Sequence, residues 1–188
     1  MRQSLDPLKA GFSQPPEGYP LGWPIKDKVS IHPIRKRLAN QIHTQHHSYI
    51  NTERHNSVVN HGIFVDGKLA GAISYAYLLC SSPIAGYEPD EYLEVARVTV
   101  GIDMPNLASC AMAESQERFR ETYAAENGIG LLVTYVHEDW DGSMFKALRG
   151  KGWQFDGVAA RRSLSRASSV RSLYSVIVHT PSGLYQRP

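Results

Sequence analysis

Cysteine, excess charge and long apolar runs are all scarce in this sequence of 188 residues. Cys80 and Cys110 are its only cysteines, too few for a disulfide-stapled scaffold, so two buried free thiols are expected. No run approaches the roughly 18 apolar residues of a membrane helix, and the first residues lack the apolar core of a secretory signal. These absences argue against membrane-spanning and disulfide-rich classes and predict a cytoplasmic protein without a membrane partner.

The composition predicts one soluble globular domain with an arm in front of it. Hydrophobic residues make up 42% and charged residues 20% of the chain, and the net charge is only +2. Residues 1–24 are rich in proline and have no periodic pattern, so we expect an N-terminal arm there. Residues 25–188 are expected to form the single domain, because their number is typical of one.

The periodicity of residues 29–179 predicts alternating strands and helices. A strand, "VSIHPI", precedes a helix over 34–47, and Asp66 and Gly67 form the tight turn of a hairpin. "LEVARVTV" is a strand, and the following helix runs from Leu107 to about Ala125, where Asn127 and Gly128 stop it. "IGLLVTYV" is apolar throughout and should lie centrally in the sheet. "DGSMFKALRG" is a short helix, and "GWQFDGVAA" and "SLYSVIVH" are the last strands.

This order of elements, over roughly residues 29–180, resembles the acyl-CoA-dependent N-acyltransferase fold called GNAT. Two segments, "LEVARVTVGIDMPNLAS" and "LLVTYVHEDWDGSMFKALRGKGW", resemble the Mom family of phage DNA-modifying acyltransferases more narrowly. "HHSYINTERHNSVVNHGIF" resembles a segment of related phage and prophage proteins. The matching positions are Arg97, Asn106, Ser109, Thr134, Tyr135, Glu138, Gly142, Ala147, Gly152 and Trp153. The resemblance implies an α/β fold whose central sheet is mixed, mostly antiparallel and flanked by helices.

The resemblance also implies a function and a cofactor. We expect a phage or prophage acyltransferase that acts in the bacterial host cell on a DNA base amine, first of all adenine N6, and protects DNA from restriction. Acetyl-CoA or a related acyl-CoA would be held by Val98, Val100, Asn106, Ser109 and Phe145. Ordinary GNAT enzymes hold the CoA pyrophosphate with a glycine-rich loop, whereas "GIDMPNLAS" has only Gly101. The amino end of the following helix still offers unpaired N–H groups, although an ordinary helix cap explains Asn106 and Ser109 as well.

A cluster of ionisable residues follows the apolar strand "LLVTYV". Active sites form beyond the carboxyl ends of strands in such sheets, and acyl transfer to an amine needs a base. We expect Glu138 to be that base, with His137 as the second choice and Tyr135 beside them. Arg97 is expected either to organise this acid and the substrate or to form a structural ion pair with an acid such as Glu94. Asp139 and Asp141 are expected to cap the short helix.

Nucleic acid is the expected partner. "ARRSLSRASSVRS", residues 160–172, has no acid, and its hydroxyls and guanidinium groups suit phosphate oxygens, although a solvated loop between two strands explains it equally well. His55 and Asn56, before the hairpin, could contact a flipped base or a phosphate. The expected nucleic-acid-binding residues are His55, Asn56, Arg161, Arg162, Arg166 and Arg171.

Some alternatives stay open at the level of sequence. His43 and His47 lie four residues apart and could share a helical face as metal ligands, with iron as the metal that the Mom resemblance implies. A GNAT acetyltransferase of a small amine or a protein would not need the arginine-rich segment. A catalytically inactive DNA-binding module would retain DNA without turnover. Whether the chain forms a homodimer is also open.

Overall fold

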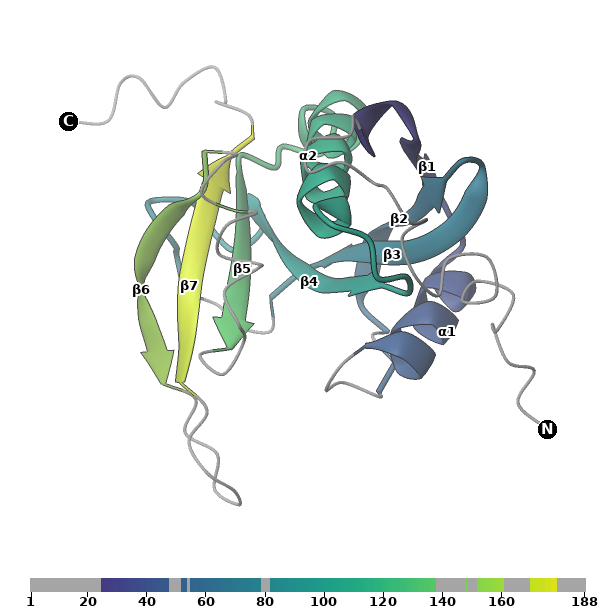
Figure 1. The fold of residues 1–188 in the computed structure, drawn as a ribbon. Helices are drawn as coiled ribbons and strands as arrows, with labels where there is room; N and C mark the ends of the chain where they lie inside the picture. The colour runs from purple at the N-terminus through teal and green to yellow at the C-terminus, as the bar shows by residue number, and fades with distance from the viewer. Residues whose placement is uncertain are drawn as a thin grey trace. The chain divides into compact units, whose positions relative to one another are not determined.

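The structure is a computed structural model that describes residues 25–47, 52–53, 55–78, 82–137, 148, 152–160 and 170–178. The arm expected at residues 1–24 lies outside this part. The first elements are η2 (Ile25–Asp27), β1 (Val29–Pro33), α1 (Lys36–His46), β2 (Ser57–Val65) and β3 (Lys68–Ala76) (Figure 1). They are followed by β4 (Tyr92–Val100), α2 (Leu107–Phe119), the π-helical turn η3 (Arg120–Ala124), β5 (Leu131–His137), β6 (Gln154–Ala160) and β7 (Val170–Ile177).

The strands form one seven-stranded sheet in the order β1-β2-β3-β4-β5-β7-β6. β1 pairs with β2, β5 with β7, and β6 with β7, all antiparallel, whereas β4 and β5 are parallel. This is the mixed, mostly antiparallel α/β sheet that the sequence predicts. β5 lies between β4 and β7, and the side chains of Leu131–Thr134 are buried, which confirms its expected central place.

The turns follow from the sequence at the places where the chain reverses or a helix stops. Asp66 and Gly67 both have positive φ, 47° and 76°, as a type I′ hairpin turn requires. Gly128, with φ 68°, follows η3, and the Asn127 side chain donates to the Tyr123 carbonyl oxygen at 2.9 Å. A residue with positive φ after a helix is a common stop signal, so the predicted end of this helix is confirmed.

The Cα backbone divides into two compact units. The first comprises the described residues up to Tyr75 together with Arg97–Ser115, and the second comprises Ala76–Ala96 and the described residues from Gln116 onward. In the first unit, α1 packs with Ala39 and Ile42 on Ala72. In the second, Tyr87 and Tyr92 pack with Leu131 and Val133. Burial of each large apolar side chain contributes about 1.5–3 kcal/mol.

Two faces of the first unit are covered by different helices. In β3, Ser74 is hydrogen-bonded to a side chain of α1, while its neighbour Tyr75 is hydrogen-bonded to Ser115 of α2. Successive residues of a strand point to opposite faces. α1 and the first part of α2 therefore cover opposite faces of these strands, as Figure 1 shows.

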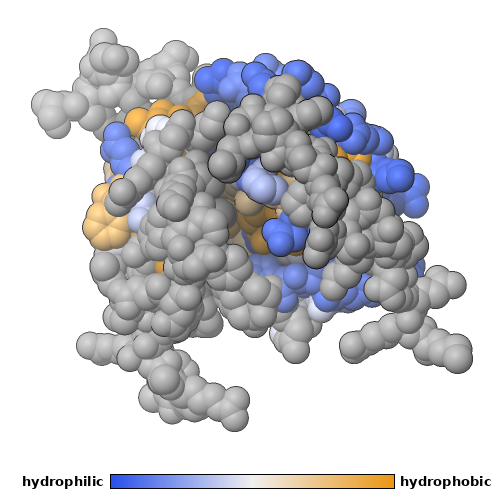
Figure 2. Space-filling model, in the orientation of Figure 1, coloured by the Kyte–Doolittle hydropathy of each residue, from blue (hydrophilic) through white to orange (hydrophobic). Residues whose placement is uncertain are grey.

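The surface of the described residues carries few large apolar side chains. Val58, Tyr77, Phe155 and Ile177 are the exposed ones in that part of the chain. Figure 2 shows one face, on which hydrophilic side chains dominate the coloured area and a few apolar ones are visible. Among the helices of the described segments, none is both long and apolar enough to cross a membrane.

One glycine of β3 is expected to be irreplaceable because of a close backbone approach. A Cβ at position 71 would lie 2.2 Å from the Thr99 carbonyl oxygen, whereas a Cβ at Gly101 would lie 3.2 Å from the Ala70 carbonyl oxygen. Gly71→Ala should therefore lower the free energy of unfolding by at least about 1–3 kcal/mol, the usual cost of overpacking. Urea unfolding of Gly71→Ala and Gly101→Ala measures the difference, and equal stabilities would contradict the close approach.

Candidate functional site

A chain of buried polar side chains joins α1 to β3 and β4 in the first unit. The His43 ring lies 2.8 Å from the Thr99 hydroxyl through Nδ1 and 2.8 Å from the Ser74 hydroxyl through Nε2. Ser74 in turn donates to Asn60 Oδ1 at 2.7 Å. All four side chains are buried, so each of these hydrogen bonds satisfies a group that would otherwise be costly to remove from water.

The donors of this network are fixed by counting protons. Ser74 has a single hydroxyl proton, which it gives to Asn60, so it must accept a hydrogen bond from His43 Nε2. Burial lowers the pKa of His43 to about 3, so the ring is neutral near pH 7 and its Nδ1 accepts from the Thr99 hydroxyl. A ring with this pKa is too weak a base to take a proton near neutral pH, and the network therefore holds its side chains in place.

Arg97 lies beside two histidines in the first unit. The pKa of His43 is lowered mainly by burial, with further contributions from His47 and Arg97. The pKa of His47 falls to about 4, again by burial first and then by the positive charge of Arg97. Arg97 and Thr99 are two residues apart in β4 and so point to the same face, the face that α1 covers. Arg97, His43 and His47 thus form one cluster, which we call the arginine–histidine cluster.

The sequence suggested separate roles for the members of this cluster. Arg97 was expected either to organise the catalytic acid and the substrate or to form an ion pair with an acid such as Glu94; its side chain is half-buried in β4, and Glu138 lies outside the described residues. His43 and His47 were candidate metal ligands. Both ring nitrogens of His43 are hydrogen-bonded to hydroxyl groups, and the described residues contain no group of three or more His, Cys, Asp or Glu side chains placed to hold a metal. Iron therefore has no support from this part of the chain.

A second buried network, on the α2 face of the first unit, was not predicted. The Ser115 hydroxyl lies 2.8 Å from His61 Nδ1 and 2.6 Å from the Tyr75 hydroxyl. The rings of His61 and Tyr75 also contact each other edge to face, with centroids 5.5 Å apart. Burial raises the pKa of the Tyr75 hydroxyl, so it stays protonated. These hydrogen bonds connect β2, β3 and α2 within an otherwise apolar layer. Hydropathy along the sequence does not predict them.

Two of the expected cofactor residues, Asn106 and Ser109, lie at the start of α2. Asn106 is exposed and has φ 63°, and its carbonyl oxygen accepts from the Cys110 N–H and the Ser109 hydroxyl, both at 2.9 Å. The Ser109 proton is thus used within the chain, whereas the Ala108 and Ser109 amides precede the first i→i−4 bond of the helix. Val98 and Val100 are half-buried in β4, and the Cys110 side chain is also half-buried. Phe145 lies outside the described residues.

In the second unit, the structure places the end of β5 beside β7. Tyr135 is half-buried and stands opposite Leu173, and His137, the last residue of β5, stands opposite Arg171. Arg171 was expected in a loop over residues 160–172, but Ala160 ends β6 and β7 begins at Val170. Arg171 is therefore a strand residue, because antiparallel pairing with β5 and β6 extends further than the apolar pattern. Glu138, Arg161, Arg162 and Arg166 lie outside the described residues.

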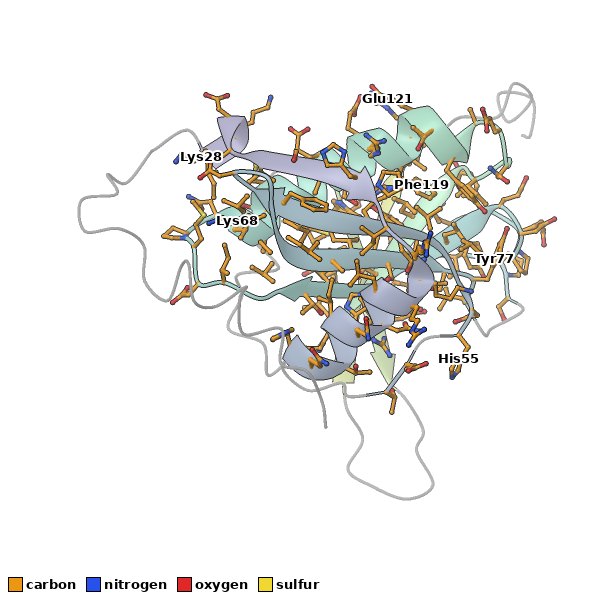
Figure 3. The ribbon with its side chains drawn as sticks, turned by 90° about the vertical axis from the view of Figure 1, so that its right-hand side faces the viewer. Lys28, His55, Lys68, Tyr77, Phe119 and Glu121 are labelled. Carbon is orange, nitrogen blue, oxygen red and sulfur yellow. The ribbon has the colours of Figure 1, made fainter. Side chains whose placement is uncertain are left out.

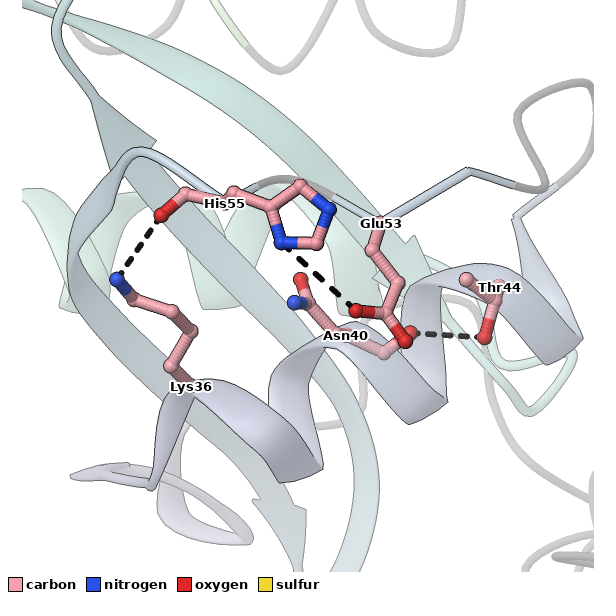
Figure 4. Close-up of polar contacts among 5 residues, drawn as sticks. All are labelled: Lys36, Asn40, Thr44, Glu53 and His55. Atoms are coloured by element: carbon pink, nitrogen blue, oxygen red, sulfur yellow. Dashed lines mark hydrogen bonds and ion pairs between the residues drawn. The ribbon is translucent and has the colours of Figure 1, made fainter.

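His55 and Asn56 lie directly before β2, next to the start of α1. The Lys36 ammonium group donates to the His55 carbonyl oxygen at 3.1 Å, and the His55 ring lies 3.9 Å from Glu53 (Figure 4). The side chain of His55 is 84% exposed, so it is available to a ligand. Asn56 is half-buried.

The buried His43 ring predicts a loss of stability in mild acid. Its pKa is 6.5 in an unfolded chain and about 3 in the folded protein, so below pH 6.5 the unfolded state binds the proton more tightly. Stability is complete above that pH and is lost progressively as the pH falls toward the folded pKa. Between about pH 8 and pH 5 the loss from His43 alone should be roughly 2 kcal/mol. Urea unfolding of His43→Gln should show a pH dependence smaller by this amount, and an unchanged dependence would contradict the neutral ring. His55→Gln, at an exposed ring, is the matched control.

Comparisons with known proteins identify both the fold and the family. The structure is similar to the ribosomal-protein-S18-alanine N-acetyltransferase of Escherichia coli, with a TM-score of 0.58 and 10% identity over 82% of this chain and 97% of that one. It is also similar to a GNAT-family acetyltransferase of Streptococcus pneumoniae, with a TM-score of 0.54 and 12% identity over 81% of this chain and 100% of that one. A candidate acetyltransferase of Salmonella typhimurium, determined with its cofactor acetyl-CoA, gives a TM-score of 0.57 and 10% identity over 83% of this chain and 97% of that one.

At these identities the structural likeness establishes the fold, which is the GNAT fold expected from the order of elements. A comparison with curated protein sequences gives no match. The sequence profile of the Mom protein family matches residues 28–168, which is well over half of the chain. The protein therefore belongs to the Mom protein family.

Proposed function

We propose that this protein transfers an acyl-like group from a coenzyme A thioester to the exocyclic amine of a DNA base, with adenine N6 as the first candidate. Membership of the Mom protein family, over residues 28–168, carries the proposal. The GNAT fold supports the use of a thioester, since one similar structure contains its cofactor acetyl-CoA. A phage or prophage protein of this kind would protect DNA from restriction in a bacterial host.

The chemistry needs a base and a site that admits a single nucleotide. The amine attacks the thioester carbonyl carbon, a C–N bond forms as the C–S bond breaks, and the amine gives up one proton. Coenzyme A leaves as a thiolate, which takes up a proton and becomes the free thiol. Adenine N6 is a weak nucleophile because its lone pair is delocalised into the ring, so a neighbouring base must take that proton. We assign this role to Glu138, with His137 as the alternative. The target base must also leave the helical stack, which costs a few kcal/mol.

The described residues fit an acyl-CoA in part. Backbone amides at the start of α2, and the exposed Asn106 side chain, are able to donate to a pyrophosphate, and the helix dipole favours negative charge there. The Ser109 hydroxyl is less available, because it already donates to the Asn106 carbonyl oxygen. Val98 and Val100 offer backbone groups and apolar side chains in β4. The acyl-CoA itself would supply the activated carbonyl group.

A thiol-release assay tests the proposal. Purified protein is incubated with acyl-CoAs, beginning with acetyl-CoA, and with an adenine-containing oligonucleotide, an adenine-free oligonucleotide, a polyamine or a short peptide. Release of free coenzyme A only with the adenine-containing oligonucleotide, together with a heavier adenosine in the digested product, is the expected result. Turnover with the polyamine or the peptide alone would replace the proposal with a small-amine or protein acetyltransferase. DNA retention without any turnover would leave only a binding module.

Protection from restriction follows if the proposal is correct. DNA from cells that express the protein should resist endonucleases whose sites contain adenine, because the added group would crowd the major-groove edge that these enzymes read. The same DNA should be cut normally at sites made only of G·C pairs. Equal cutting of both kinds of site, with and without expression, would contradict an anti-restriction role.

A further inference from the structure

The start of α1 carries a strongly basic exposed surface that the site described above does not use. Arg35, Lys36 and Arg37 are consecutive and all exposed, and the helix from Lys36 to His46 contains no acidic residue. We call Arg35, Lys36, Arg37 and the adjoining exposed His55 the α1 basic edge. Consecutive helical residues are about 100° apart around the axis. The positive charges are therefore distributed around the first turn of the helix.

These charges are not neutralised by the chain in the part that the structure describes. Ion pairs there join Lys28 to Asp66, His55 to Glu53 and Arg120 to Glu117. None of the pairs between described residues involves Arg35, Lys36 or Arg37. Like charges this close repel one another, and exposed cations without a counter-charge remain available to an anionic ligand.

A hydrogen bond also holds the backbone of the α1 basic edge in place. Lys36 donates to the His55 carbonyl oxygen, which fixes the segment before β2 against the start of the helix (Figure 4). The exposed His55 ring is thereby held next to the helix start. The Arg35 side chain makes no capping hydrogen bond with the helix, so it is not needed to form α1. A surface that keeps its backbone fixed and the side chains of Arg35 and Arg37 exposed suits a ligand with several negative charges.

We propose that the α1 basic edge binds the phosphodiester backbone of duplex DNA and so positions the chain on its substrate. The inference rests on the proposed function, because it takes DNA as the partner. Charge complementarity carries it: a polymer that presents negative charges at regular intervals matches several exposed cations, and phosphate contacts set orientation without reading sequence. The arginine guanidinium groups can grip phosphate oxygens in pairs, which a lysine cannot do.

The matched experiment removes two positive charges from each of two places. Arg35→Gln/Arg37→Gln alters the α1 basic edge, and Lys26→Gln/Lys68→Gln alters exposed lysines elsewhere on the same unit. Figure 3 shows Lys68 close to Lys28 and at the other end of this unit from His55. Both variants have the same net charge, so any effect of total charge is shared. Because all four side chains are exposed, both variants should melt as the wild type does.

Binding of a fluorescent duplex is measured by anisotropy as a function of salt. Loss of two phosphate contacts should reduce the slope of log affinity against log salt by about 1.8, at roughly 0.9 for each contact, in the arginine pair and by nearly nothing in the lysine pair. Lys36→Gln should reduce the slope by about half as much as the arginine pair. These results would support the proposal.

Other outcomes would overturn the inference or the function beneath it. Equal slopes for the two double variants would remove the α1 basic edge from DNA binding while leaving the proposed function intact. Polyglutamate that competes as well as DNA at equal charge would show a general acidic-partner surface and would overturn the inference. A wild-type protein that binds no duplex at about 50 mM salt, and that releases no thiol with DNA, would instead end the proposed function.

Discussion

Arg97→Ala is expected to abolish base modification, with a loss of at least about a hundredfold, the usual effect of removing one charge-stabilising donor from an active site. Arg97 lies half-buried in β4 and influences the charge state of His43 and His47. Arg97→Lys keeps the charge but not the planar fork, so it should recover only part of the activity. Arg120→Ala, at an exposed residue, is the control for a simple loss of charge.

A second measurement separates a functional Arg97 from a merely structural one. The positive charge of Arg97 contributes to the lowered pKa values of both histidines, so its removal should raise them, and NMR titration of the imidazole signals reports this directly. The rise should be partial, since burial is the larger cause and remains. Wild-type modification with unchanged histidine titration would show that Arg97 neither acts in the site nor neighbours this pair.

Glu138→Gln is expected to have an effect as large as that of Arg97→Ala. The amide keeps the shape of the side chain but cannot accept a proton, and loss of a general base costs roughly 10²–10⁴-fold in rate. His137→Asn tests the alternative base at the end of β5, opposite Arg171. If Glu138 is the base, the pH profile of the residual activity in Glu138→Gln should lose its acidic limb, while His137→Asn should retain it.

The opposite pattern would assign the base to His137. Full activity in both variants would remove the whole segment after β5 from the chemistry. The melting temperature should be close to that of the wild type in each case, because each substitution keeps the approximate size of the side chain.

The local elements were predictable because each has its own chemical signal. The Asp66–Gly67 turn needs two residues that tolerate positive φ, and the stop after Asn127 uses a glycine in the same way. The central place of β5 follows from its apolar residues Leu131, Leu132 and Val133, which cover both faces of the strand. Because these signals are local, they predict the turn, the helix end and the strand without any knowledge of the tertiary fold.

Only part of the arginine–histidine cluster could be predicted from the sequence. The spacing of His43 and His47 on one helical face, and of Arg97 and Thr99 on one strand face, can be read directly. The sequence does not show which face of the helix packs against which face of the strand. The histidines were therefore only candidate metal ligands in the sequence, whereas the structure shows His43 hydrogen-bonded to the hydroxyl groups of Thr99 and Ser74.

Ser74 was missed because nothing in the sequence of β3 marks it as a hydrogen-bond partner of a helix. Ala72 packs with the α1 residues Ala39 and Ile42, and alternation along the strand places Ser74 on the same face. The His43 ring lies 2.8 Å from the Ser74 hydroxyl on that face. The sequence does not show which side chain of α1 reaches this face, because that depends on the tertiary packing.

The proposal is tested most directly by mass spectrometry of nucleosides from the DNA of cells that express the protein. The expected result is a new deoxyadenosine derivative, heavier by the mass of the transferred group, which is present with the wild-type protein and absent with Glu138→Gln or Arg97→Ala. If nucleosides from cells that contain the folded wild-type protein are indistinguishable from those of cells without it, DNA-base modification by this chain is contradicted.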